Sequence, residues 1–200
     1  MALILASASP RRSELLRNAG FAFTVQPAHV PEEPLPSEPP LAYAKRLAKE
    51  KARAVFARHP DSVVLGADTI VVAYEHLLEK PRDAADAARM LRLLSGRGHQ
   101  VITGVCVIAP GFELTDAEIT EVRFSPLSLD EISAYIQTGE PMDKAGAYAI
   151  QGRASRWVER IDGCYFNVVG LPVPLVYRII RKLQEETGIE LTNRILSDGE

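Results

Sequence analysis

The N-terminal segment, residues 1–12, constrains the fold most, because it combines a buried strand with the start of a helix. Its apolar run, Ala2–Ala6, predicts a short buried strand. Ser9 then stands where a helix N-cap is expected, and Pro10 stands at the first helical position, which proline favours. The segment therefore predicts a sharp strand-to-helix junction.

Two arginines follow at this junction. Arg11 and Arg12 lie in the first helical turn, where the helix dipole disfavours cations. Together with the hydroxyls of Ser7 and Ser9 and the backbone N–H groups of the helix start, they would bind a polyanion. The alternative is a solvated pair of arginines on a surface helix.

The composition is that of a soluble globular chain. Its 200 residues suffice for one large domain or for two lobes that share a core. The net charge of −3 argues against a general nucleic-acid binder, so a basic site has to be local. No apolar run approaches the ~20 residues of a membrane span, and no signal peptide is visible. We therefore expect a cytoplasmic protein without nucleic-acid or membrane partners, with reduced thiols at Cys106 and Cys164.

Two neighbouring segments supply further charged candidates. Residues 27–40 hold six prolines and three glutamates, including Glu32, which predicts a long loop, either a lid over a site or a plain connector. The helix predicted for Pro40–Arg58 has an apolar face at three- and four-residue spacing, and Lys51 lies inside that face. Because an isolated buried ammonium is costly, Lys51 has to pair, to point into a polar cleft or to snorkel to the surface.

Residues 62–73 predict two strands separated by a break at Gly66. Asp68 and Thr69 interrupt this apolar stretch. Aspartate is a poor strand former, and a carboxylate in such a setting needs a partner or a metal. We favour a functional aspartate over a turn residue between two strands. Lys80 follows at the end of a short hairpin.

The rest of the chain predicts further helices and strands within a single domain, residues 1–186, followed by a C-terminal tail, residues 187–200. The expected segments are, in order, a helix over 83–94, strands over 101–109 and 113–124, a helix from 128 to 139, a glycine-rich loop over 143–152, a strand over 156–161, a turn region over 163–170 and a helix over 172–186. The glycine-rich loop carries Lys144 and Gln151, and its composition lets backbone approach a ligand closely.

Several common motifs are absent: the P-loop, the dinucleotide fingerprint, zinc-ligand spacings and the serine hydrolase elbow. What remains is a set of cations and two carboxylates, namely Arg11, Arg12, Lys51, Lys80 and Lys144 with Glu32 and Asp68. Such a set fits phosphoryl chemistry, in which cations hold a polyphosphate while carboxylates carry Mg²⁺ and a water.

A series of motifs runs through the chain in unbroken order from residue 3 to about residue 183. They are S-A-S-P-R-R, R-L-A-K-E-K-A, L-G-A-D-T-I-V, L-E-K-P, L-S-G-R-x-H-x-V-x-T-G-V, D-K-A-G-A-Y-A-I-Q-G and V-V-G-L-P. The series resembles the Maf family, also called septum-formation inhibitors, which comprises nucleoside triphosphate pyrophosphatases. The resemblance implies an α/β fold with a mixed, twisted β-sheet, flanking helices and two lobes around a cleft, like the inosine-triphosphate pyrophosphatases. It also implies a cytoplasmic homodimer, Mg²⁺ or Mn²⁺ as cofactor, and the reaction NTP + H₂O → NMP + pyrophosphate.

The resemblance further implies roles for individual residues. The triphosphate would be held by Ser7, Ser9, Arg11, Arg12 and Lys144. Charge on the pyrophosphate leaving group would be neutralised by Lys51 and Lys80. The divalent ion would bind Glu32 and Asp68, and Asp68 would accept the proton of the attacking water. Thr69 and Gln151 would recognise a uracil or thymine base.

The motifs I-Q-G and V-V-G-L-P resemble the subtype that hydrolyses dTTP and UTP, with modified pyrimidine nucleotides as a further substrate class and a house-cleaning role linked to cell-division arrest. Small departures from the family pattern, Ala8, Arg153–Ser155 and Cys164, concern fine substrate preference. Two alternatives stay open. One is a 7-methyl-GTP pyrophosphatase, and the other is a non-catalytic nucleotide-binding regulator of septum formation.

Overall fold

The computed structural model describes residues 1–192, which form two compact units. Unit 1 comprises Met1–Asp68, Thr103–Ala117 and the described residues from Gly170 onward, and unit 2 comprises Thr69–Ile102 and Glu118–Val169. Of the predicted tail, residues 187–200, positions 193–200 lie outside the described residues. No helix in the described part of the chain is long and apolar enough to cross a membrane.

The strands form one mixed sheet of seven strands, which confirms the predicted α/β class. The strands are β1 (Leu3–Leu5), β2 (Phe23–Val25), β3 (Val63–Ala73), β4 (His76–Leu78), β5 (Gly98–Ala109), β6 (Phe112–Phe124) and β7 (Val158–Asp162). Their order is β2-β1-β3-β5-β6-β7, with β4 paired to β3. β1 runs parallel to both β2 and β3, whereas β4 and β7 pair antiparallel with β3 and β6. The sheet therefore combines parallel and antiparallel strand pairs.

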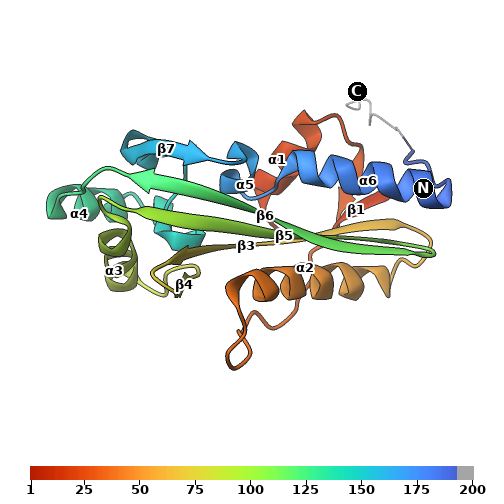
Figure 1. Ribbon diagram of the computed structural model, residues 1–200, viewed down its shortest axis with the longest axis horizontal. Helices are drawn as coiled ribbons and strands as arrows, with labels where there is room; N and C mark the ends of the chain where they lie inside the picture. Colours follow the sequence, from red (N-terminus) through yellow and green to blue (C-terminus); the bar gives the residue numbers. More distant parts are fainter. Residues whose placement is uncertain (193–200) are drawn as a thin grey trace. The chain divides into compact units, whose positions relative to one another are not determined.

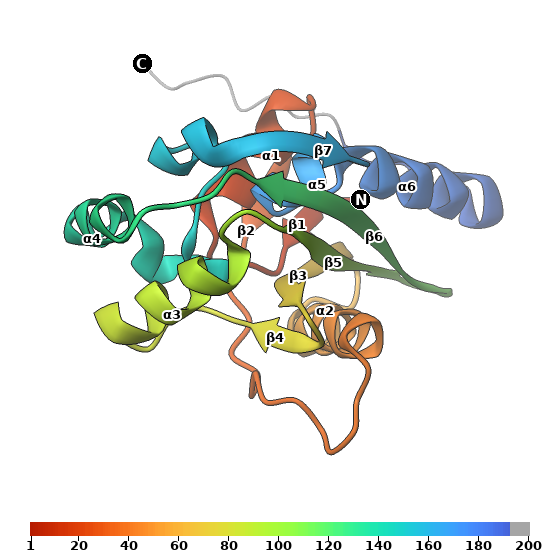
Figure 2. The ribbon, with the colours of Figure 1, turned by 60° about the vertical axis from the view of Figure 1, so that its left-hand side comes forward.

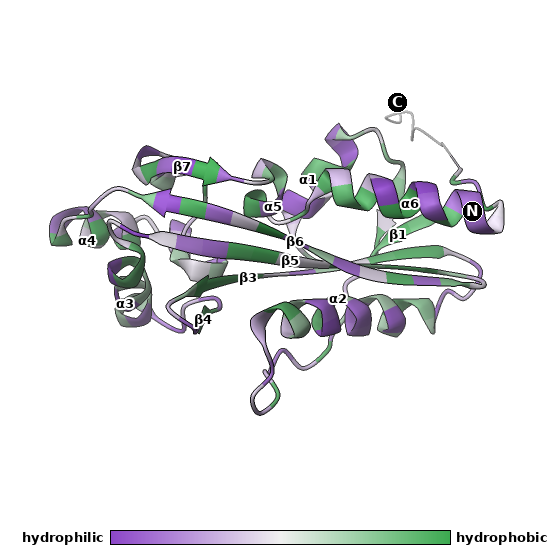
Figure 3. Ribbon diagram, viewed as in Figure 1, coloured by the Kyte–Doolittle hydropathy of each residue, from purple (hydrophilic) through white to green (hydrophobic). Residues whose placement is uncertain are grey.

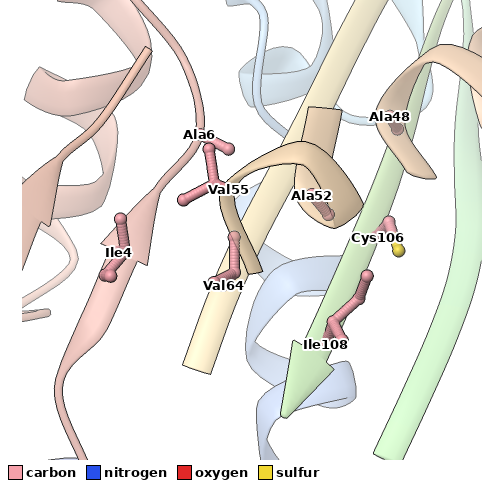
Figure 4. Packing of buried hydrophobic residues seen from close by; sticks show 8 residues of the cluster. All are labelled: Ile4, Ala6, Ala48, Ala52, Val55, Val64, Cys106 and Ile108. Carbon is pink, nitrogen blue, oxygen red and sulfur yellow. The ribbon is translucent and has the colours of Figure 1, made fainter. Parts of the chain in front are cut away.

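In unit 1, helices cover both faces of the strands. Figures 1 and 2 show α2 (Pro40–Phe56) on one face, and α1 (Pro10–Asn18) and α6 (Val173–Thr187) on the other. Figure 3 shows hydrophobic and hydrophilic residues alternating around α6, whose apolar side chains are buried. Beneath α2, a cluster of buried side chains joins the helix to the strands: Ile4, Ala6, Ala48, Ala52, Val55, Val64, Cys106 and Ile108 (Figure 4). This cluster fixes the position of α2, the helix that carries Lys51.

The predicted break at Gly66 is wrong, since β3 runs without interruption from Val63 to Ala73. Gly66 serves a different purpose. A Cβ atom at this position would lie 2.2 Å from the backbone oxygen of Ala48 and 2.7 Å from the backbone nitrogen of Ala52. Only glycine therefore lets α2 approach the strand this closely. Because β3 is continuous, Asp68 is a strand residue and not a turn aspartate.

In unit 2, local sequence signals set the ends of the helices as predicted. Asp83 caps α3 (Ala84–Leu94) by accepting a hydrogen bond from the backbone N–H of Asp86. Ser128 and Glu131 form the predicted capping box of α4 (Leu129–Gln137). The turn expected between β3 and β4 is also present, with Tyr74 and Glu75 at positive φ.

Elsewhere in unit 2 the predicted boundaries shift. The expected turn region over 163–170 contains a short helix, α5 (Tyr165–Val169). The expected strand over 156–161 begins only at Val158, because residues 153–157 form a 3₁₀ segment, η3 (Arg153–Trp157). Two further 3₁₀ segments, η1 (Glu140–Asp143) and η2 (Ala145–Ala147), shape the glycine-rich loop. Both free thiols agree with prediction: Cys106 is buried and Cys164 is half-buried, and they form no disulfide.

Candidate functional site

The strand-to-helix junction at the N-terminus is built around the hydroxyl of Ser7. This buried oxygen accepts hydrogen bonds from the backbone N–H of Ser9 at 3.2 Å and from Nη1 of Arg12 at 3.0 Å. Ser9 occupies the predicted N-cap position of α1, but its side chain makes no capping bond. The junction thus orders the Ser7 hydroxyl and the Arg12 guanidinium.

Arg12 is held from a second side as well. Its Nε donates to the backbone oxygen of Gly170 at 2.8 Å, so the arginine joins the start of α1 to the segment before α6. Burial lowers the pKa of the Arg12 guanidinium, while the negative charges of Asp68 and Glu32 act in the opposite direction. Arg12 therefore lies within electrostatic range of both carboxylates. Arg11, in the same turn, is half-buried and its charge also acts on Arg12.

Lys51 pairs with two carboxylates. Of the three possibilities for a lysine in an apolar helix face, pairing is therefore the one that the structure shows. Its Nζ lies 2.6 Å from Oδ1 of Asp68 on β3 and 2.6 Å from Oε1 of Glu32 on the loop before α2. The side chains of Lys51 and Asp68 are only 9% and 10% exposed, whereas that of Glu32 is 47% exposed. A buried ammonium is thus balanced by a buried carboxylate and by one that reaches solvent.

Three residues distant in sequence therefore converge on one point of unit 1. The predicted residues Glu32, Lys51 and Asp68 form this cluster, which we call the carboxylate–lysine cluster. Its formal charge is −1, which leaves an excess negative charge beside the cationic junction of Ser7 and Arg12. Such a neighbourhood of opposite charges suits a ligand that consists of an anionic chain and a bound cation.

The cluster offers carboxylate oxygens, the donors that hard divalent ions prefer. Among residues 1–192, no three histidine, cysteine, aspartate or glutamate side chains gather as a metal-binding group. Mg²⁺ commonly binds through one or two protein carboxylates, and substrate phosphates and waters complete its shell. Glu32 and Asp68, two carboxylates that meet at a single Nζ atom, match that donor set.

The four predicted residues of unit 2 lie on separate segments. Thr69 is half-buried on β3, and Lys80 is exposed just after β4. Lys144 is largely occupied by its own loop, because its Nζ donates to the backbone oxygen of Glu140 at 2.9 Å and pairs with Asp143. Gln151 is exposed in the turn before η3. Their predicted roles in substrate binding stay predictions.

The turn that presents Gln151 is anchored by Glu140, which the sequence analysis did not single out. Oε1 of Glu140 accepts from the hydroxyl of Tyr135 at 2.9 Å and from the backbone N–H of Arg153 at 3.0 Å. The Tyr135 oxygen in turn accepts from the backbone N–H of Ala149 at 3.2 Å. Hydrogen bonds on both sides of Gln151 therefore fix this turn, and no residue spacing in the sequence predicts them.

Comparison with known proteins agrees with the motif series. The family model described as Maf-like protein matches residues 2–183. A dTTP/UTP pyrophosphatase of Koribacter versatilis is 62% identical over 182 residues, which cover 91% of this chain and 94% of that protein. Proteins of the same name from Geobacter sulfurreducens and Aquifex aeolicus are 54% and 47% identical, over 90% and 94% of this chain and 96% and 98% of theirs.

Proposed function

Because this chain belongs to the family of Maf-like proteins, we propose that it is a nucleoside triphosphate pyrophosphatase that hydrolyses dTTP and UTP to the monophosphate and pyrophosphate. The names of its relatives support the substrates, since they are called dTTP/UTP pyrophosphatases at 47% to 62% identity. The structural observation that carries the proposal is the carboxylate–lysine cluster, Glu32, Lys51 and Asp68, beside the cationic junction.

In this proposal Asp68 is the general base. A water oxygen attacks the α-phosphorus, its proton passes to the Asp68 carboxylate, and the bond from the α-phosphorus to the bridging oxygen breaks. The electron pair of that bond leaves with pyrophosphate. Lys51 lies 2.6 Å from Oδ1 of Asp68 and orients the carboxylate for this role. Because Asp68 is buried, its carboxylate is shielded from bulk water.

The cofactor is part of the same proposal. Glu32 and Asp68 would hold Mg²⁺ or Mn²⁺, because these carboxylates are the oxygen donors that converge in unit 1. When bound, such an ion supplies charge neutralisation for the phosphates and acidifies a coordinated water.

The cations have the complementary task of holding the nucleotide. Ser7, Ser9, Arg11 and Arg12 would bind phosphate oxygens at the start of α1, where N–H groups and guanidinium groups offer donors to an anion. We propose that Lys51 and Lys80 neutralise charge on the pyrophosphate leaving group, that Lys144 adds charge to phosphate binding, and that Thr69 and Gln151 recognise the pyrimidine base. We also propose that the protein acts as a homodimer in the cytoplasm.

The deciding experiment is product analysis with dTTP, UTP and 7-methyl-GTP, each with Mg²⁺, using the Asp68→Asn variant as the control. We expect UMP and pyrophosphate from UTP, and dTMP and pyrophosphate from dTTP. Release of orthophosphate would contradict cleavage between the α- and β-phosphates, and faster turnover of 7-methyl-GTP would place the chain in the sister subtype. A nucleotide-induced rise in melting temperature without any product would favour the non-catalytic regulator.

A further inference from the structure

The part of the loop around Glu32 has little packing to hold it. Residues 26–39, which we call the Glu32 loop, form neither helix nor strand between β2 and α2. Residues 31–37 are all exposed, and Leu35 keeps 55% of its surface in solvent. Figures 1 and 2 show the segment as an open loop beside α2. Its five prolines also lack the N–H groups that a backbone ladder would need, so polar side chains have to fix its shape.

Arg46 supplies several of these contacts. Nε and Nη2 of Arg46 on α2 each lie 2.7 Å from an oxygen of Glu38, a two-bonded pairing near the end of the loop. The same Nη2 donates to the backbone oxygen of Glu33 at 2.9 Å. Glu33 is the residue next to Glu32, so the bond acts on the backbone directly beside the carboxylate of the cluster.

The arginine is itself well fixed. Its Nη1 donates to Glu50 at 3.0 Å, and its guanidinium carbon lies 5.4 Å from the centre of the Tyr43 ring. Tyr43 is buried, so its ring is held in place beneath the Arg46 guanidinium. The carboxylate of Glu38 also accepts from the backbone N–H of Leu35 at 3.0 Å, which closes the turn of the loop. These bonds lower the pKa of Glu38, chiefly through its hydrogen bond to Arg46.

We infer that Arg46 is a positioning residue that places Glu32 against Lys51 and Asp68. The inference rests on the proposed function, in which Glu32 binds the divalent ion. α2 thus determines the position of the loop at two points five residues apart: Lys51 pairs with the Glu32 side chain, and Arg46 holds the adjoining backbone and Glu38. Without Arg46, Glu32 would have to be ordered when the ion binds, and the ion would bind more weakly.

The same helix offers a matched control. Arg53, two helical turns further on, also holds a glutamate with two bonds, to Glu113 at 3.0 Å each. Glu113 lies on β6 and not on the Glu32 loop. The Arg53→Ala variant therefore removes a similar surface pair from α2 and leaves the loop untouched.

The test compares Arg46→Ala, Arg46→Lys, Glu38→Gln and Arg53→Ala with the unchanged chain, and Glu32→Gln is added for the turnover measurement alone. The Mg²⁺ concentration at half-saturation is measured through UTP turnover and through the slowing of cleavage by a glutamate-specific protease. Because Glu33 and Glu38 precede prolines, the Glu32–Glu33 bond is the one in the loop that this protease can cut. The second measurement needs no turnover.

We expect Arg46→Ala to raise the half-saturating Mg²⁺ concentration roughly 10-fold and to speed cleavage after Glu32. Arg46→Lys should restore the Mg²⁺ requirement only in part, because an ammonium cannot make the two-bonded pairing with Glu38. Glu38→Gln removes the tether from the loop side, so a folding defect in one variant does not end the test. Arg53→Ala should change neither value by more than about twofold.

Two outcomes separate the inference from the proposed function. An unchanged Mg²⁺ requirement in Arg46→Ala and Glu38→Gln, even with faster cleavage, would overturn the inference, since the arginine would then only stabilise the loop. An unchanged requirement in Glu32→Gln would instead refute the metal role proposed for Glu32.

Discussion

Replacing Lys51 by methionine tests the electrostatic balance of the carboxylate–lysine cluster. Methionine keeps most of the volume of the lysine stem but removes the ammonium that lies 2.6 Å from Asp68. Asp68 then stays buried with its nearest positive partner gone. Removing one partner of a buried pair typically costs about 3–5 kcal/mol of unfolding free energy. We expect the lower end, about 3 kcal/mol, because Glu32 is half exposed and is rehydrated when it loses Lys51.

The measurement is urea unfolding at neutral pH, supported by melting curves, in which ~3 kcal/mol corresponds to a fall of roughly 6–12 °C for a chain of this size. Lys45→Met is the matched control. Lys45 lies on the same helix and also pairs with an aspartate, at 3.1 Å from Asp116, but these side chains are 36% and 53% exposed. An exposed pair contributes less than about 1 kcal/mol.

A second variant isolates the cause. In Lys51→Met combined with Asp68→Asn, the buried negative charge is gone, so most of the lost stability should return. The reasoning fails if Lys51→Met loses no more stability than Lys45→Met, or if the Asn substitution returns none of it. Either result would mean that Lys51 contributes through its packed stem and not through its charge.

Three further predictions concern the base, a buried histidine and the glycine under α2. Asp68→Asn should lower turnover by about 10²–10⁴ while a nucleotide still raises the melting temperature, and unchanged turnover would remove Asp68 from the chemistry. Burial lowers the pKa of His99 to about 4 from 6.5, so the unfolded chain binds the proton first and stability falls as pH drops through that window. The unfolding free energy that is lost between pH 7 and pH 4 should be about 3 kcal/mol smaller in His99→Gln than in the unchanged chain. An equal loss in the two proteins would contradict this role of His99. Gly66→Ala places a Cβ 2.2 Å from the backbone oxygen of Ala48 and should destabilise by about 1–3 kcal/mol, whereas Gly98→Ala, whose Cβ is 3.8 Å from its nearest atom, should be nearly neutral; equal urea midpoints would refute the packing argument.

The sequence predicted those structural features whose causes are local. Asp83 and the Ser128–Glu131 capping box mark helix starts because a cap is made within three residues. Lys51 stood out because a lysine in an apolar helix face has few alternatives to pairing. Asp68 stood out for the same reason on a strand. The motif series then predicted the family, since it extends over nearly the whole chain.

Other features depend on partners that are distant in sequence. The sequence predicted a break at Gly66, whereas the glycine is required by the close approach of α2. The contact is with Ala48, eighteen positions earlier in the chain, so no local pattern shows it. α5 was missed since its five residues are too few to show a helical period. Nothing local distinguishes Arg46 from any other arginine on a solvated helix face, because its acceptors lie on a loop whose shape the sequence does not specify.

The sequence by itself thus determined which side chains had to find partners: a lysine, an aspartate and two arginines in places where solvation or the helix dipole is unfavourable. Only the tertiary structure decided which partners they find. It brings Lys51 within 2.6 Å of both Asp68 and Glu32, and it lets Arg46 hold the loop next to Glu32. The physical reason is that the cost of burying a charge depends on one residue and its own segment. An ion pair also depends on how two segments lie relative to each other, and here the packing of α2 on the strands fixes that position.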